Sequence, residues 1–102
     1  MQGKMDDIAL EMAQLNQETA RAPWRELQVF FATGKAVWVD SSLDLLEVAV
    51  ALKHDSIDQV KQWQSQQLVA VVSDQQALGW YDNDRLLWTV VVKPFVLVQD
   101  KA

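Results

Sequence analysis

Apolar residues at helical spacing mark the start of the chain. Over residues 5–15 an apolar side chain recurs every three or four positions, which predicts an amphipathic helix. The positions of this stripe are Met5, Ile8, Met12 and Leu15. A helix this short is only marginally stable in isolation. The three- and four-residue spacing of its apolar side chains approximates the contact seam of two paired helices. We therefore expect it to contribute to the interface of a homodimer, with docking on its own domain as the alternative.

Four further helices are predicted downstream of a polar connection. Pro23 suits a first helical position, Gly34 suits the residue after a helix end, and Ser73 with Gln76 resembles a capping box. The predicted ranges are 23–33, 43–54, 57–67 and 74–82. The second of these helices is apolar around most of its circumference. We expect it to be the central helix of the core, with a narrow solvated stripe that runs through Asp44, Glu47 and Ala51.

Short runs of β-branched and aromatic residues predict four strands. Their ranges are 36–40, 68–72, 86–92 and 95–99. The third run is apolar on both faces, which is typical of a central or covered strand. Pro94 between the last two strands predicts a bend or turn. The pattern favours an α+β fold with four to five helices and a small sheet of three to four short strands. A small α/β domain with a mixed sheet is the alternative.

The length of 102 residues predicts one domain. Residues 1–20 form its N-terminal helix and connection, and residues 21–102 its compact core. Five tryptophans are many for such a chain. All five fall on predicted inward faces, so core packing is expected for most of them and partial exposure for one or two.

Several separated blocks of the sequence together resemble domain-of-unknown-function family 2288, a group of short bacterial proteins. The blocks extend from Leu15 to Gln99 and keep the same order. They are LNQETARAPWRELQVFFATGK, VWVDSSLDLLEVAVAL, VKQW, SDQQALGW and LWTVVVKPFVLVQ. The resemblance implies family membership and assigns no activity and no functional residue.

The order of the predicted elements is also similar to that of the winged-helix fold. Helices 43–54 and 57–67 would form its helix-turn-helix, with Ala49 as the small residue where the helices cross. Residues 73–85 depart from the pattern, because they predict an extra helix where a wing hairpin is short. The expectation is a winged-helix-like core with an extra helix, and a fold-level likeness assigns no function.

Charge and composition exclude several classes of function. The net charge is −5, and no two of the nine lysines and arginines are adjacent, so nucleic-acid binding is unlikely. The absence of cysteine excludes disulfides and thiolate chemistry and favours a reducing compartment. The N-terminus carries acids where a signal peptide needs basic residues, and no apolar stretch is long enough to span a bilayer. A cytoplasmic protein without a membrane contact is expected.

Thr19, Arg21 and Arg25 flank the start of predicted helix 23–33. Helix starts bind anions, and an arginine can clamp a carboxylate or phosphate, so these residues are the candidate contacts of an anionic ligand. The alternative is an arginine that pairs with a carboxylate of the same domain.

Asp44, Glu47 and His54 are the remaining candidates, and they lie along one stripe of helix 43–54. Spread over three turns they are too far apart for one metal ion, and their positions suit the two ends of the helix dipole. No serine elbow accompanies the single histidine, so a catalytic triad is not expected. No metal, cofactor or enzymatic activity is expected. A non-catalytic protein-interaction module that self-associates is the leading hypothesis. A winged-helix DNA-binding regulator and a small anion- or metabolite-binding domain are the alternatives.

Overall fold

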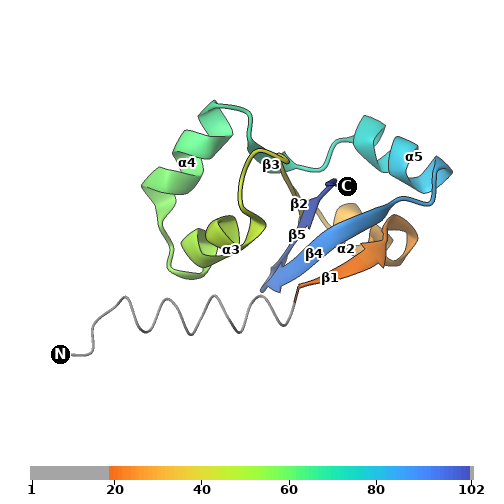
Figure 1. Cartoon of the computed structure of the whole chain (residues 1–102), viewed down its shortest axis with the longest axis horizontal. Helices are drawn as coiled ribbons and strands as arrows, with labels where there is room; N and C mark the ends of the chain where they lie inside the picture. The colour runs from red at the N-terminus through yellow and green to blue at the C-terminus, as the bar shows by residue number, and fades with distance from the viewer. Residues whose placement is uncertain (1–18, 102) are drawn as a thin grey trace.

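The computed structural model describes residues 19–101, which form a mixed five-stranded sheet with helices on both sides (Figure 1). The strand order is β1–β4–β5–β2–β3. The strands are β1 (Ala20–Pro23), β2 (Ala36–Val39), β3 (Val69–Val71), β4 (Leu86–Val92) and β5 (Phe95–Gln99). The helices are the 3-10 helix η1 (Trp24–Leu27), α2 (Gln28–Ala32), α3 (Leu45–Lys53), α4 (Ile57–Ser65) and α5 (Asp74–Asp82).

The last strand in sequence lies at the centre of the sheet. β5 pairs antiparallel with β4 and parallel with β2, where Ala36 lies opposite Val96. The outer strands β1 and β3 pair antiparallel with β4 and β2, respectively. The chain turns between β4 and β5 at Lys93 and Pro94, as Pro94 predicted.

Both faces of the sheet carry a core, because successive residues of a strand point to opposite sides. On the first face, Trp24 of η1 is fully buried and meets Trp80 of α5 edge-to-face with ring centroids 5.1 Å apart. On the second face, α3 packs on β4 and β5, and α4 packs on β3. The buried residues of the first face are Trp24, Leu27, Ala36, Val72, Ala77, Trp80, Leu87, Val96 and Val98. Those of the second face are Val39, Leu45, Val48, Ala49, Val69, Val90 and Leu97.

α3 is the most buried of the described helices, as its sequence predicted, with four buried residues against two in α5 and none in α4 or α2. The predicted solvated stripe is wrong at Ala51, which is only 8% exposed. Ala51 lies beside Ile57 and Val60, because α4 folds back on this side of α3. Glu47 and His54 are exposed, as expected for that stripe.

Three further expectations need correction. Residues 20–23 form a strand where the sequence predicted the end of the polar connection and the start of a helix, so the described sheet has five strands. Predicted helix 23–33 is divided into η1 and α2, and Pro23 ends a strand where it was expected to begin a helix. The winged-helix likeness is not confirmed, since β5 joins β2 in parallel and α3 and α4 lie between two paired strands. The α+β class and the mixed sheet of the alternative are confirmed.

Candidate functional site

The second face of the sheet has no described helix over its β1 end. α3 packs on β4 and β5 and α4 packs on β3, whereas neither of these helices packs on β1, which pairs with β4 at the edge of the sheet (Figure 1). In the register of this pair, Arg21 lies opposite Trp88 and Pro23 opposite Leu86. Leu86 is 47% exposed and Trp88 is half-buried. We call this surface the open face, and it consists of Thr19, Arg21, Leu86, Trp88 and Lys101.

Arg21 is held flat on the open face by two contacts. Its guanidinium carbon lies 5.1 Å from the centroid of the Trp88 ring, within the range of a cation–π interaction. Its Nη2 donates a hydrogen bond of 3.4 Å to the backbone oxygen of Lys101. Arg21 is exposed, and a guanidinium has five N–H donors, two of which can form parallel hydrogen bonds to a carboxylate.

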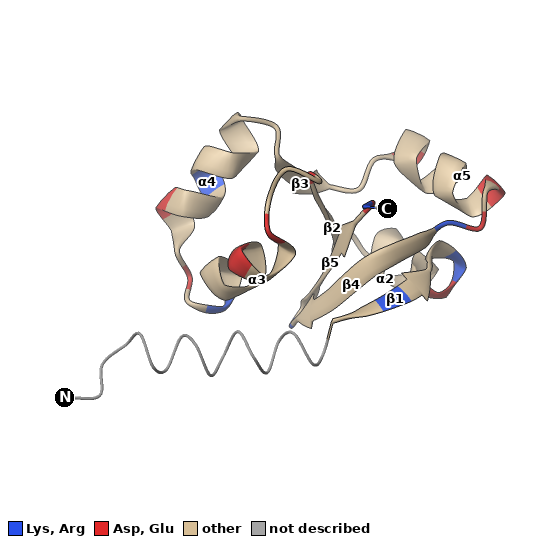
Figure 2. Cartoon of the chain, in the orientation of Figure 1, with Lys and Arg blue, Asp and Glu red and all other residues tan. Residues whose placement is uncertain are grey.

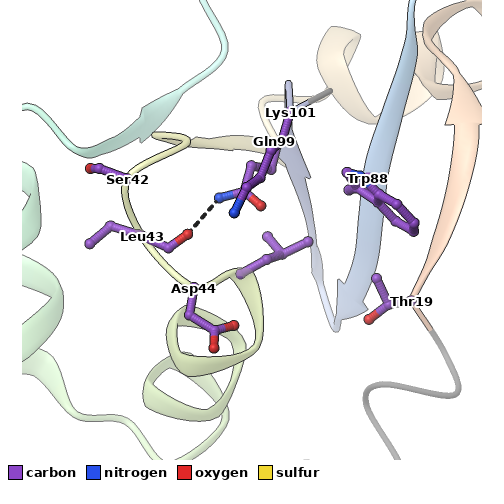
Figure 3. A pocket seen from close by; sticks show the side chains of 8 residues that line it. Thr19, Ser42, Leu43, Asp44, Trp88, Gln99 and Lys101 are labelled. Carbon is purple, nitrogen blue, oxygen red and sulfur yellow. Dashed lines mark hydrogen bonds between the residues drawn. The ribbon is translucent and has the colours of Figure 1, made fainter.

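A groove of about 620 Å³ separates the open face from the segment before α3. In Figure 3, Trp88 and Thr19 form one side and Ser42, Leu43 and Asp44 the other, with Gln99 and Lys101 between them. A second depression of about 300 Å³ lies at the other end of the open face, between Arg21 and Leu86. The open face is therefore a ridge of strand residues between two hollows.

Gln99 fixes the wall of the groove opposite Trp88. It is a polar residue only 4% exposed, and its Nε2 donates to the backbone oxygens of Asp40 at 2.9 Å and of Leu43 at 2.8 Å. Two hydrogen bonds from one buried amide satisfy it and hold the segment from Asp40 to Leu43 against β5.

Two aspartates organise the same wall locally. Asp44 is the N-cap of α3, and its Oδ1 accepts from the backbone N–H of Leu46 at 2.9 Å. Asp40 accepts from the backbone N–H of Ser42 at 2.9 Å. Hydrogen bonds from the side chain and then the backbone of Ser42 lower the pKa of the Asp40 carboxyl and outweigh the opposing effect of burial. Both carboxylates thus serve the loop and the helix start, which is a structural role.

The groove is lined by one cation, Lys101, and one acid, Asp44. Figure 2 shows basic positions on β1 and at the chain end beside β5, which are Arg21 and Lys101, and acidic positions toward α3. Arg85 beside the open face is already paired with Asp100, at 2.8 Å. Arg21 and Lys101 are thus the cations of this face that the structure offers to a ligand, and an acidic partner suits them.

The sequence comparisons place the chain in a family. The family described as "Protein of unknown function (DUF2288)" matches residues 11–100. The chain belongs to this family. Among curated proteins no relative matches it. The fold is similar to that in the NMR solution structure of PA1075 from Pseudomonas aeruginosa, with 37% sequence identity and a TM-score of 0.79. That likeness covers 100% of this chain and 92% of PA1075.

For this family member, the structure brings together two of the three predicted anion contacts. Thr19 and Arg21 both lie on the open face. Arg25 lies apart from them on η1, over the ring of Tyr81 at 4.6 Å and 3.8 Å from the carboxylate of Asp84. Arg25 therefore follows the alternative interpretation, in which an arginine pairs within its own domain.

Sequence reasoning missed the residues that the sheet adds to this site. Leu86 and Trp88 are two positions apart on β4 and face the same side, and this spacing can be read from the sequence. That no described helix covers them cannot be read from the sequence. Lys101 and Gln99 join the site only because β5 lies beside β4. Strand order is a non-local property, so no local motif could place them there.

The other predicted sites show no ligand chemistry in the described residues. Asp44, Glu47 and His54 do not converge, and within residues 19–101 no cluster of three metal-binding side chains occurs. In the same range no helix is long and apolar enough to cross a membrane. Met5, Ile8, Met12 and Leu15 lie outside the described residues, and their interface remains a prediction.

Proposed function

We propose that this protein is a non-catalytic protein-interaction module that associates with itself through the open face. One observation carries the proposal: the β1 end of one sheet face has no described helix packed on it, and Leu86 is exposed and Trp88 half-buried there beside charged groups. An apolar sheet surface rimmed by polar residues is typical of an interaction site. Tryptophan and arginine, which meet here at Trp88 and Arg21, are the residues most enriched among interface hot spots.

Self-association is the form of interaction that the surface favours. A two-fold symmetric interface is made of one patch that meets itself, so the patch must carry both signs of charge. Lys101 and Asp44 both line the groove, and Arg21 and Asp84 both line the second hollow. The surface is thus able to complement a copy of itself.

A pair of matched leucine variants tests this proposal by sedimentation equilibrium of the full chain. Leu86→Glu places a charge on the open face, and Leu78→Glu places the same charge on α5, where Leu78 is 64% exposed and lies away from the open face. We expect the unmodified chain and Leu78→Glu to be dimers at tens of micromolar and Leu86→Glu to be a folded monomer. A monomeric unmodified chain, or a dimeric Leu86→Glu, would refute the proposal.

The groove favours a second candidate, the binding of a small anionic ligand. Its volume of about 620 Å³ lies in the range of small-molecule sites, Lys101 and Thr19 line it, and Arg21 donates a hydrogen bond to the backbone oxygen of Lys101. Titration with acetate and with inorganic phosphate, followed by the indole signal of Trp88 in NMR spectra, tests this function. A saturable shift that Arg21→Ala together with Lys101→Ala abolishes would support it, and unchanged spectra would refute it.

DNA binding through α4 is the weaker alternative. The exposed side of this helix carries Asp58 beside Lys61, its only cation, and glutamines, so few phosphates could be neutralised. We expect a Kd for duplex DNA of about 10⁻⁴ M or weaker at physiological salt. Salt-sensitive, sequence-dependent retardation of DNA at submicromolar protein would contradict this expectation.

A further inference from the structure

The N-terminal segment and the open face carry opposite charges. Residues 1–18 contain four acidic residues, Asp6, Asp7, Glu11 and Glu18, and one basic residue, Lys4, which gives a net charge of −3. The open face presents Arg21 and Lys101. On a helical projection of the sequence, Asp7 and Glu11 run along one flank of the apolar stripe predicted over residues 5–15. The sequence thus offers an apolar stripe with an acidic border.

The open face has the complementary arrangement. Leu86 and Trp88 form its apolar ridge, and Arg21 and Lys101 lie beside Trp88. A helix over residues 5–15 would be about 16 Å long, comparable with the width of a few strands of this sheet. Its apolar stripe would rest on Leu86 and Trp88, and its acidic border would meet the two cations.

We infer that the open face of one protomer receives the N-terminal segment of a second copy, and that the exchange is reciprocal. The inference rests on the proposed self-association and names its contact. Each segment would cover β1 and the exposed Leu86 end of β4 in the other protomer, where no described helix packs on this face. Because the two contacts are identical, the exchange closes as a two-fold symmetric dimer.

Charge reversal on each side of the contact provides the test. The face variant is Arg21→Glu with Lys101→Glu, and the segment variant is Asp7→Lys with Glu11→Lys. All four residues belong to the full chain, and Arg21 and Lys101 are exposed, so folding should persist and is checked by circular dichroism. A control variant, Lys35→Glu with Lys61→Glu, makes the same net charge change as the face variant at exposed lysines outside the open face.

Each reversed variant alone should raise the dimer Kd about tenfold or more, because like charges then meet at both contacts. The control variant should dimerise as the unmodified chain does. A one-to-one mixture of face and segment variants should form a heterodimer, detected by its mass in native mass spectrometry. In that heterodimer the reversed face meets the reversed segment and the native face meets the native segment, so both contacts are favourable.

The apolar side of the contact is tested by a third variant, Met5→Glu with Ile8→Glu and Met12→Glu, which should be monomeric and folded. A mixture of charge variants that stays monomeric, or reversed variants that dimerise normally, would overturn the inference. If Leu86→Glu is monomeric while the charge reversals have no effect, the exchange fails and the proposed self-association stands. If the unmodified chain is monomeric, both fail.

Discussion

The two faces of the sheet differ in how completely helices cover them. On the first face, η1 and α5 meet over the strands, and the fully buried Trp24 packs against Trp80 and Phe31. On the second face, α3 and α4 connect β2 with β3 and pack on β4, β5 and β3, and neither packs on β1. The β1 end is left with Arg21, Leu86 and Trp88 at the surface. The first face therefore serves stability, and the gap in the second is where a function in binding is best sought.

Replacing the tryptophans on the two faces should separate these roles most strongly. Trp24→Ala should lower the free energy of unfolding by about 3–5 kcal/mol, because a fully buried indole leaves a cavity. Trp88→Ala should cost less than half as much, since its ring is half-buried. Urea unfolding measures both values.

Trp24→Phe serves as the control for the first of these variants. The Nε1 of Trp24 has no hydrogen-bond partner within the described residues, so packing dominates its contribution. The phenylalanine variant should therefore recover part of the loss. Equal losses of unfolding free energy for Trp24→Ala and Trp88→Ala would show that the two faces contribute equally to stability, which would contradict the difference described between them.

Neighbouring leucines of α3 should show that the covered part of the second face is a true core. Leu45 is buried, whereas Leu46 is half-buried against the same cluster. Leu45→Ala should cost about 2–4 kcal/mol and Leu46→Ala about 1–2 kcal/mol. Thermal and urea unfolding of the two variants measure the two losses in the free energy of unfolding. A larger loss for Leu46→Ala than for Leu45→Ala would contradict the packing described for α3.

Gln99→Glu should weaken the boundary between the covered and the open part of the second face. A carboxylate cannot donate to the backbone oxygens of Asp40 and Leu43, so both hydrogen bonds are lost and one carboxylate oxygen then faces two carbonyl oxygens. The expected loss is about 1–3 kcal/mol. Amide hydrogen exchange of residues 40–44 should accelerate in the same variant. Unchanged exchange there would mean that Gln99 does not hold the groove wall.

The smallest effect is expected at Asp40, at the edge of the groove. Its pKa is lowered in the folded state, so its contribution to stability is present above the ordinary pKa of a carboxyl and is lost as the pH falls through the lowered folded value. Ser42→Ala removes the largest cause and should raise the pKa of Asp40 toward its ordinary value. An NMR titration of the Asp40 carboxyl tests this, and an unchanged pKa would contradict the assigned cause.

Local sequence signals predicted where most helices and strands lie along the chain. They did not predict which elements pack beside one another. The period of α3 and the capping box of α5 fixed those helices, because both signals depend on residues within a few positions. β1 was missed because its four residues, ARAP, contain a proline and no β-branched side chain, and pairing with β4 makes it a strand. Ala51 was misplaced for a related reason, since its cover comes from α4.

The candidate site shows the same division between local and distant information. Arg21 and Arg25 were grouped because they are close in sequence. The strand ends at Pro23, so Arg21 lies on the open face while Arg25 lies on η1 beside Tyr81. Trp88 and Lys101 joined the site through strand pairing alone. A local motif search therefore found the start of the site, and the sheet supplied the rest.

The central position of β5 has a consequence for how the protein is made. A ribosome releases β1 to β4 first, and they cannot form one sheet, because β4 and β2 are joined only through β5. Until β5 emerges, both of its neighbours present unpaired edges with apolar side chains, which is a state prone to aggregation. Native structure should therefore appear late in synthesis. Nascent chains stalled before Phe95 should be sensitive to protease, and chains extended past Gln99 by a linker that clears the exit tunnel should resist it.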